Sequence, residues 1–366
     1  MRVWYNRTFS SVYTALKLIR DADTDGRFTL IHSNPNRHMP AARIVHEFHS
    51  EPTGLAPVGI CLRFQPGRFE FHSEPTGLEA EAYADWCLEF CRAQRIDIFV
   101  PGRGASTLAA HHARFAAIGT RVLSAATPAK LALIHDKAGF YAETVLPQAP
   151  VAEFRRFENL AQFDAAWLDL RPRHAKLCIK PSHGIYGIGF AVVDEERSAA
   201  ALLLAGVEYH IGYQDLRRGL AELGEFRTML LMEYLDGQEY SIDCVGDHGR
   251  LVAAVARRKL PQAGSGQQID MRPELIEATA RLTADYGLNG IFNVQFRDSG
   301  QGEARRARLL EINPRMSGGI GMACAAGPNL PWIALKGFAD GFDSVAVPEV
   351  RNGMRVIEMA EAQELP

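Results

Sequence analysis

Short apolar runs alternate with amphipathic stretches over the first 125 residues of the chain. Strand-like runs occupy residues 2–5, 28–33 and 96–100, while residues 12–20 and 78–94 carry apolar side chains at helical spacing. Strands that alternate with helices predict a parallel sheet with right-handed crossovers. We therefore expect an α/β domain over residues 1–125.

Loops that follow the strands of such a sheet lie at its ligand-binding edge. Three polar loops, at residues 6–11, 34–37 and 102–106, are therefore candidates for the wall of a substrate site. Ordinary solvent-exposed turns are an equally good interpretation of any one of them.

The pattern changes near residue 127. Pro128 stands at the first position of a predicted helix, and residues 176–180 read as a strand that enters a glycine-rich turn. Further strands are expected at residues 229–235, 239–245, 251–257, 290–296 and 307–312, with a long helix at residues 272–286. This mixture predicts an α+β second half with antiparallel pairing. We place its subdomains at residues 126–205 and 206–366.

A nine-residue segment occurs twice in the first half of the chain. Residues 47–55 recur without change at residues 70–78. A single recurrence does not make a repeat protein, so we interpret it as a local tandem duplication within residues 47–78. Residues 56–69 would then form an inserted hairpin or loop that the fold tolerates.

Length and composition narrow the class of protein. A chain of 366 residues is too long for one hydrophobic core, and a net charge of −3 gives no general attraction to nucleic acid or to an anionic membrane. No apolar stretch approaches a membrane span or a signal peptide. The six cysteines form no Cys-x-x-Cys pair. We expect a reduced, cytoplasmic setting with neither nucleic-acid nor membrane partners.

A glycine-rich segment begins at Lys180. Gly184, Gly187 and Gly189 follow this lysine, which ends a predicted strand. Glycines let backbone N–H groups approach phosphate oxygens, and a lysine adds a positive charge. The segment is not a P-loop, because no Gly-Lys-Ser/Thr follows. A glycine-rich hairpin without function is an equally good interpretation of this segment alone.

A second segment joins an apolar strand to two carboxylates. Backbone groups from Glu233 to Leu235 could meet an adenine edge, and Glu239 could accept hydrogen bonds from ribose hydroxyls. Taken alone, the segment is better explained as a strand-turn-strand hairpin with solvent-facing acids.

The third segment is the most specific. Gln295 and Glu311 lie on neighbouring predicted strands, and Asn313 shares a strand face with Glu311. Three oxygen donors from two strands suit a Mg²⁺ ion that also binds nucleotide phosphates. Arg315, on that same face, would offer permanent donors to a transferring phosphoryl group. A plain salt bridge between Glu311 and Arg315 does not explain the shared amide, acid and arginine.

These three elements, in this order, resemble the ATP-grasp superfamily. The likeness is strongest to the branch that includes the carbamoyl-phosphate synthetase large subunit and biotin carboxylase. It rests on two motifs, Asn-Val-Gln-Phe at residues 293–296 and Glu-Ile-Asn-Pro-Arg at residues 311–315. The chain is also similar to ATP-grasp proteins of biosynthetic operons linked to tellurite resistance. The resemblance implies a Rossmann-like pre-ATP-grasp domain followed by an α+β ATP-grasp fold of two subdomains.

The resemblance also implies a role for each candidate residue. Two lysines would bind phosphate, a glycine lid would cover it, and two strands would hold adenine, ribose and metal. The residues concerned are Lys137 and Lys180 for phosphate; Gly184, Gly187 and Gly189 for the lid; Glu233 and Leu235 for adenine; Glu239 for ribose; Gln295, Glu311 and Asn313 for Mg²⁺ or Mn²⁺. Arg315 would stabilise the transition state, and Arg257 would contact a substrate carboxylate or phosphate.

The expected activity is an ATP-dependent ligation of a small-molecule carboxylate to an amine or similar nucleophile, with release of ADP and phosphate. Many relatives dimerise, so a homodimer is a further expectation. A non-catalytic ATP-binding subunit or sensor remains an alternative. A nicotinamide-dependent dehydrogenase is disfavoured, because the first strand is followed by Asn-Arg-Thr-Phe rather than by glycines.

Overall fold

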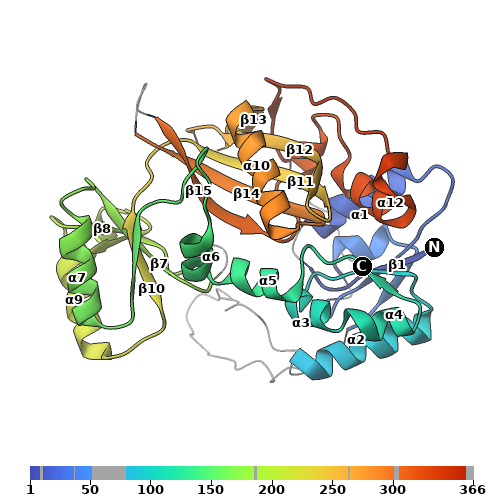
Figure 1. Cartoon of the computed structure of the whole chain (residues 1–366), viewed down its shortest axis with the longest axis horizontal. Coiled ribbons are helices and arrows are strands. Elements are labelled where there is room, and N and C mark those ends of the chain that lie inside the picture. The colour runs from blue at the N-terminus through green and yellow to red at the C-terminus, as the bar shows by residue number, and fades with distance from the viewer. Residues whose placement is uncertain are drawn as a thin grey trace.

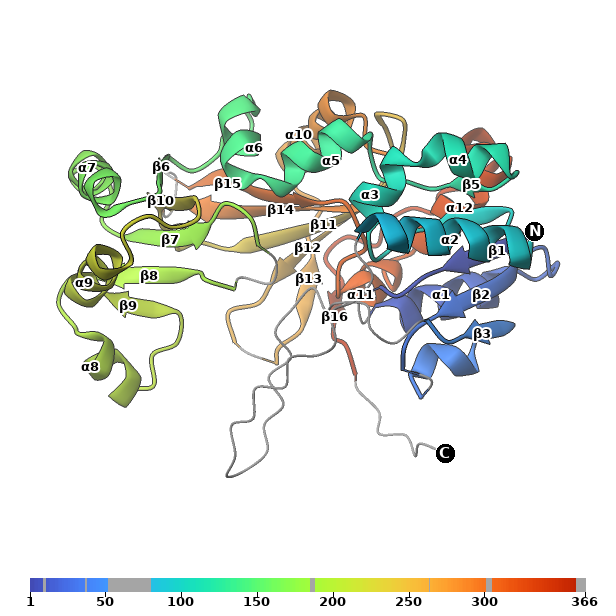
Figure 2. The same ribbon diagram turned by 90° about the horizontal axis from the view of Figure 1, so that it is seen from below.

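The computed structural model describes residues 1–8, 11–36, 38–51, 80–184, 188–262, 264–300 and 305–359. Over these ranges the chain forms an N-terminal sheet, a small sheet and a large sheet. The large sheet lies between the other two (Figures 1 and 2). No helix in the described ranges has the length and apolarity needed to span a membrane.

The N-terminal sheet is parallel, as the alternation of strands and helices predicts. Its strands have the order β3-β2-β1-β4-β5, which places β1 at the point where the order reverses. They are β1 (Arg2–Tyr5), β2 (Thr29–Ser33), β3 (Glu47–His49), β4 (Ile98–Val100) and β5 (Arg121–Val122), with helices α1 (Val12–Ala22), α2 (Ala80–Gln94), α3 (Ala105–Ala110) and α4 (His112–Ala117). Trp4 stacks on Phe99 at 4.2 Å between ring centroids and anchors one core of this domain.

The duplicated segment is only partly described. Its first copy contributes β3 and the buried Glu51, whereas residues 52–78 lie outside the described ranges. The proposed insertion of residues 56–69 therefore stays a prediction.

The small sheet extends past the boundary expected at residue 205. Its order is β6-β10-β7-β8-β9, so β10 pairs with β6 and β7 rather than forming a hairpin with the next strand. The strands are β6 (Phe154–Phe157), β7 (Leu177–Pro181), β8 (Ala191–Asp194), β9 (His210–Gly212) and β10 (Met229–Glu233). The reason is burial, because Leu230 and Leu231 face different hydrophobic cores on the two sides of β10. Helices α7 (Leu160–Leu170), α8 (Ala199–Leu204) and α9 (Tyr213–Leu223) complete this unit.

The large sheet is antiparallel throughout, as predicted. It has the order β15-β14-β11-β12-β13-β16. The strands are β11 (Glu239–Asp247), β12 (Arg250–Lys259), β13 (Gln267–Ile269), β14 (Gly290–Ser299), β15 (Arg306–Asn313) and β16 (Arg355–Val356). Helix α10 (Pro273–Tyr286) packs against β12, starts with proline and ends at Gly287, whose φ is 59°. Helices α11 (Ile320–Cys324) and α12 (Leu330–Asp340) contact α1 and so join the sheet to the N-terminal domain.

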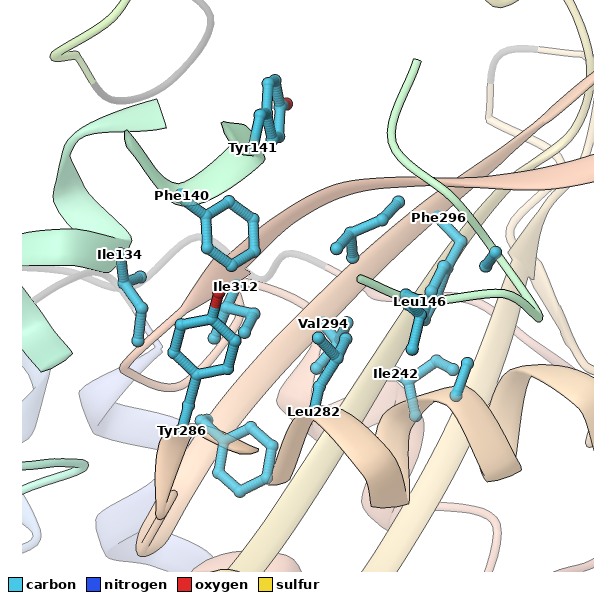
Figure 3. Close-up of a cluster of buried hydrophobic side chains, with 14 of the residues drawn as sticks. Ile134, Phe140, Tyr141, Leu146, Ile242, Leu282, Tyr286, Val294, Phe296 and Ile312 are labelled. Carbon is cyan, nitrogen blue, oxygen red and sulfur yellow. The ribbon is translucent and has the colours of Figure 1, made fainter. Parts of the chain in front are cut away.

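Two short helices connect the three units. Helices α5 (Pro128–His135) and α6 (Lys137–Glu143) run from the N-terminal domain toward the small sheet (Figure 2). Figure 3 shows their side chains packed with those of α10 and of the large sheet. The labelled residues are Ile134, Phe140, Tyr141, Leu146, Ile242, Leu282, Tyr286, Val294, Phe296 and Ile312, all buried in one core cluster. This core fixes the start of α6 relative to β15, where the candidate site lies.

Candidate nucleotide and metal site

The strand pair β14–β15 places the predicted metal ligands together. Gln295 and Glu311 are direct cross-strand partners, and the register shifts just after Gln295. Asn313 lies two residues beyond Glu311, and its side-chain amide donates to Glu311 Oε1 at 2.9 Å. Alternation along a strand had predicted this shared face. The three oxygen-bearing side chains therefore converge from neighbouring strands.

The helix α6 brings a lysine to the same carboxylate. Asp136 caps this helix by accepting from Ala138 N at 3.2 Å, and Lys137 N donates to Ser182 O at 3.1 Å. These bonds hold the start of α6 at the end of β7. Lys137 Nζ then donates to Gly184 O at 2.7 Å and lies 3.9 Å from Glu311 Oε2. Burial lowers the pKa of Lys137, and the carboxylate of Glu311 opposes that shift.

A second lysine reaches the site from β7. Lys180 Nζ donates to the hydroxyl of Tyr141 at 2.6 Å and lies 4.8 Å from the centre of that ring. Desolvation lowers the pKa of Lys180, while the negative charge of Glu311 again raises it. Two lysines on different elements thus lie near one carboxylate, and their role toward phosphate stays a prediction.

A cavity of about 270 Å³ opens between the small sheet and the large sheet. Eight of the predicted residues line it: Lys137, Lys180, Gly184, Glu233, Leu235, Glu239, Gln295 and Glu311. Apolar side chains, among them Met232 and Phe190, complete the lining. An apolar cleft with a few convergent polar groups is the usual form of a small-molecule site.

Other contacts are known for two of the predicted cofactor residues, Glu239 and Gly189. Glu239 forms an ion pair with Lys259 at the start of β11. Gly189 has a φ of 83°, and a side chain there would approach Pro181 at 3.1 Å. Gly187 lies outside the described residues. The roles of these residues toward adenine, ribose and phosphate stay predictions.

Arg315 lies beside a second, smaller cavity of about 60 Å³. This cavity lies between the N-terminal domain and the large sheet, and its lining includes Thr8, Gly102 and Ala105 from two of the three predicted loops. Ser106 also contacts His135, with 3.2 Å between Oγ and Nδ1. Burial and the positive charges of Lys137, Arg315 and His183 lower the pKa of His135. The region between the two cavities is therefore rich in positive charge.

Arg257 occupies a different environment. It is 2% exposed, and its guanidinium donates to Asp243 Oδ2 at 2.7 and 2.8 Å and to Ser317 Oγ at 3.0 Å. A Cβ atom on Gly319 would lie 2.5 Å from this guanidinium, so only glycine permits the close approach. Arg257 is buried beneath the turn that follows Arg315, and its expected contact with a substrate stays a prediction.

Two polar residues of the site were not singled out from the sequence. Arg297 lines the cavity and donates to Gly237 O at 3.1 Å, and Tyr141 binds Lys180. Strand alternation places Arg297 on the face of Gln295, and helical spacing places Tyr141 one turn after Lys137. Both signals were present in the sequence, but neither residue belongs to the motifs that carried the resemblance.

The donor set suits a metal ion that arrives with a nucleotide. Within the described ranges, no group of three or more His, Cys, Asp or Glu residues could hold a metal alone. Glu311 instead has amide-bearing neighbours, Gln295 and Asn313. Mg²⁺ commonly binds proteins through one or two carboxylates and takes its other ligands from phosphates and water. The residues present fit that mode.

Part of the chain matches a known family, and nearly the whole chain shares its fold with solved structures. Residues 225–362 match the family described as ATP-grasp in the biosynthetic pathway with Ter operon. The chain has the ATP-grasp fold. N5-carboxyaminoimidazole synthetase from Staphylococcus aureus, solved with ADP, shares this fold with a TM-score of 0.61 and 13% identity, over 96% of this chain and 80% of that one. L-amino acid ligase from Bacillus licheniformis gives a TM-score of 0.58 and 14% identity, over 95% and 77%.

A curated relative matches over a shorter stretch. Carnosine synthase 1 of Mus musculus is 34% identical over 108 residues, which covers 26% of this chain and 13% of that protein. The solved structures confirm the ATP-grasp fold with its Rossmann-like first domain, and the family match over residues 225–362 agrees with the resemblance inferred from the motifs. In the N-terminal domain, the loops after β1 and β4 contact each other. Asn6 Oδ1 accepts from Gly102 N at 2.6 Å at the point where the strand order reverses.

Proposed function

We propose that this ATP-grasp protein is an ATP-dependent ligase that activates a carboxylate as an acyl phosphate and joins it to an amine or similar nucleophile. The observation that carries the proposal is that Lys137, Lys180, Glu311 and Gln295 line one cavity, with Lys137 paired to Glu311 and Gln295 opposite Glu311 on the neighbouring strand. The names of L-amino acid ligase and carnosine synthase 1 support formation of a carbon–nitrogen bond.

Phosphoryl transfer depends mainly on position and charge. Lys137 and Lys180 would bind the phosphates, with adenine against the backbone of residues 233–235 and ribose near Glu239. Mg²⁺, or Mn²⁺, held by Gln295, Glu311 and Asn313, would neutralise charge on the phosphate oxygens. Arg315 would hold the carboxylate at the second cavity, so that a carboxylate oxygen attacks the γ-phosphorus and ADP leaves.

The second step involves no oxidation or reduction, so it needs no redox cofactor. The nucleophile attacks the carbonyl carbon of the acyl phosphate, the new bond forms, and phosphate leaves with the electron pair of the broken carbon–oxygen bond. The amine loses one proton in this step. Positive charge between the cavities stabilises the developing oxyanion and the departing phosphate.

The test is ADP release from Mg·ATP with a panel of amino acids and amines, in pairs. We expect one or more pairs to stimulate ADP release in the wild type and the Glu311→Ala variant to lose that stimulation while remaining folded. Glu311 is partly exposed, so its removal should leave stability nearly unchanged. Unchanged turnover in Glu311→Ala would contradict the assignment of the site. Nucleotide binding without ADP release for any pair would favour a non-catalytic sensor.

A further inference from the structure

The hydroxyl group of Tyr141 connects the two lysine-bearing parts of the site. It accepts a hydrogen bond from Lys180 Nζ at 2.6 Å and donates one to the carbonyl of Leu310. Lys180 belongs to β7 of the small sheet, whereas Leu310 belongs to β15 of the large sheet. Leu310 immediately precedes Glu311. One hydroxyl on α6 therefore links the phosphate lysine of one sheet to the metal-site strand of the other.

The chemistry of the phenol suits this position. Tyr141 is 2% exposed, and burial raises its pKa well above the ordinary value, so the hydroxyl keeps its proton. A protonated phenol can accept from an ammonium group and donate to a carbonyl at the same time. Its ring also lies 4.8 Å from Lys180 Nζ, which adds a cation–π contact. Phe154 packs on the ring at 5.4 Å between centroids and restricts its movement.

We propose that Tyr141 is a positioning residue that sets the place of the Lys180 ammonium relative to Glu311. The inference rests on the proposed nucleotide site, but it assigns a role to a residue outside the motifs of that site. Without the hydroxyl, Lys180 would keep only the ring face as a partner at this point. Its ammonium would then turn more freely, and a phosphate would meet it less often in the binding geometry.

A matched control lies in the same hydrophobic core. Lys130 lies over the ring of Tyr286, with 4.9 Å between its Nζ atom and the ring centre. The hydroxyl of Tyr286 forms a hydrogen bond with Thr144 Oγ1 at 2.7 Å. Figure 3 shows Tyr141 at the edge of the cluster and Tyr286 within it. Tyr286 does not belong to the lining of the 270 Å³ cavity. Tyr286→Phe therefore removes an equivalent hydroxyl from the same core without touching Lys180.

The experiment is a calorimetric titration of the full chain with Mg²⁺ and the β,γ-imido analogue of ATP. Tyr141→Phe removes a hydrogen bond to a charged group. From the usual strength of such a bond, we expect the variant to bind the analogue roughly 10- to 100-fold more weakly than the wild type. Tyr286→Phe should bind like the wild type. Thermal unfolding of both variants checks that each is folded.

A double-mutant cycle separates positioning from a general structural effect. If Tyr141 acts through Lys180, then Tyr141→Phe should cause no further loss of affinity in the Lys180→Met background. Wild-type affinity in Tyr141→Phe, or an equal loss in both backgrounds, would overturn the positioning role. A wild-type protein that does not bind the analogue would overturn the nucleotide site itself, which is a different result.

Discussion

Two clusters of charged residues each include a carboxylate of the large sheet, and they differ in what surrounds them. The cavity cluster, Lys137, Lys180 and Glu311, lines an opening of about 270 Å³, and its ion pair is 3.9 Å long. The buried cluster, Arg257 and Asp243, has a 2.7 Å ion pair, with the two side chains 2% and 0% exposed. Each contains an ion pair to a carboxylate on a strand of the large sheet. The first adjoins space for a ligand, and the second does not.

The difference shows why residue type alone does not identify a functional arginine or lysine. Arg257 has Asp243, Ser241, Gln267 and Ser317 as partners, so the protein itself satisfies its donors. Asn293 completes the network by donating to Asp243 Oδ1 at 3.1 Å. Such a network stabilises the turn that follows Arg315. Lys137 and Lys180 instead remain partly desolvated beside a cavity, and their lowered pKa values reflect that state.

The largest expected effect is on the buried cluster. Arg257→Leu leaves the Asp243 carboxylate buried without its charge partner, which should lower the free energy of unfolding by roughly 3–5 kcal/mol. Urea-induced unfolding measures this, and Arg257→Leu combined with Asp243→Leu should recover part of the loss. An Arg257→Leu variant that is as stable as the wild type but lacks ligase activity would contradict the structural role of the buried cluster. It would support Arg257 as a substrate contact.

A smaller effect is expected in the cavity cluster, and on binding rather than stability. Lys180→Ala removes a charge-assisted contact with phosphate and should weaken binding of the Mg·ATP analogue by roughly 1.5–3 kcal/mol. The free energy of unfolding should not fall, because the buried ammonium itself opposes folding. Calorimetry and urea unfolding on the same variant measure both quantities. Equal affinity for the analogue would remove Lys180 from the phosphate site.

The smallest expected effect is a dependence of affinity on pH. Burial lowers the pKa of Lys180 below the ordinary value of 10.5, so its charge is lost as pH rises through that lowered value. Bound phosphate favours the ammonium form, so nucleotide binding at alkaline pH should weaken and take up a fraction of a proton. Titrations in buffers of different ionisation enthalpy measure this uptake. Lys180→Ala should reduce it, whereas uptake that is the same in the variant would exclude Lys180 as the source.

Local patterns in the sequence predicted much of the fold and part of the cavity site. Alternation along residues 290–296 and 307–312 predicted the strand pair and the shared face of Gln295 and Glu311, which the structure confirms. The sheet to which β10 belongs could not be predicted in this way. A strand buried on both faces carries no alternation, and its neighbours β6 and β7 are distant in the sequence.

The environment of Arg257 could not be predicted from the sequence, for a similar reason. Its partners come from β11, β13 and the turn after β15, and no spacing along the chain reports that convergence. Tyr141 differs, since its position one helical turn after Lys137 was visible in the sequence. What the sequence lacked was the neighbouring carbonyl of Leu310, which only the packed strands provide.

The central claim is that the cavity transfers a phosphoryl group from ATP to a carboxylate. It is tested most directly with a carboxylate labelled with ¹⁸O, chosen from the pairs that stimulate ADP release. If an acyl phosphate forms, one ¹⁸O atom passes from the carboxylate to the released phosphate in each turnover, and Glu311→Ala abolishes this transfer. Ligation with unlabelled phosphate would contradict the account.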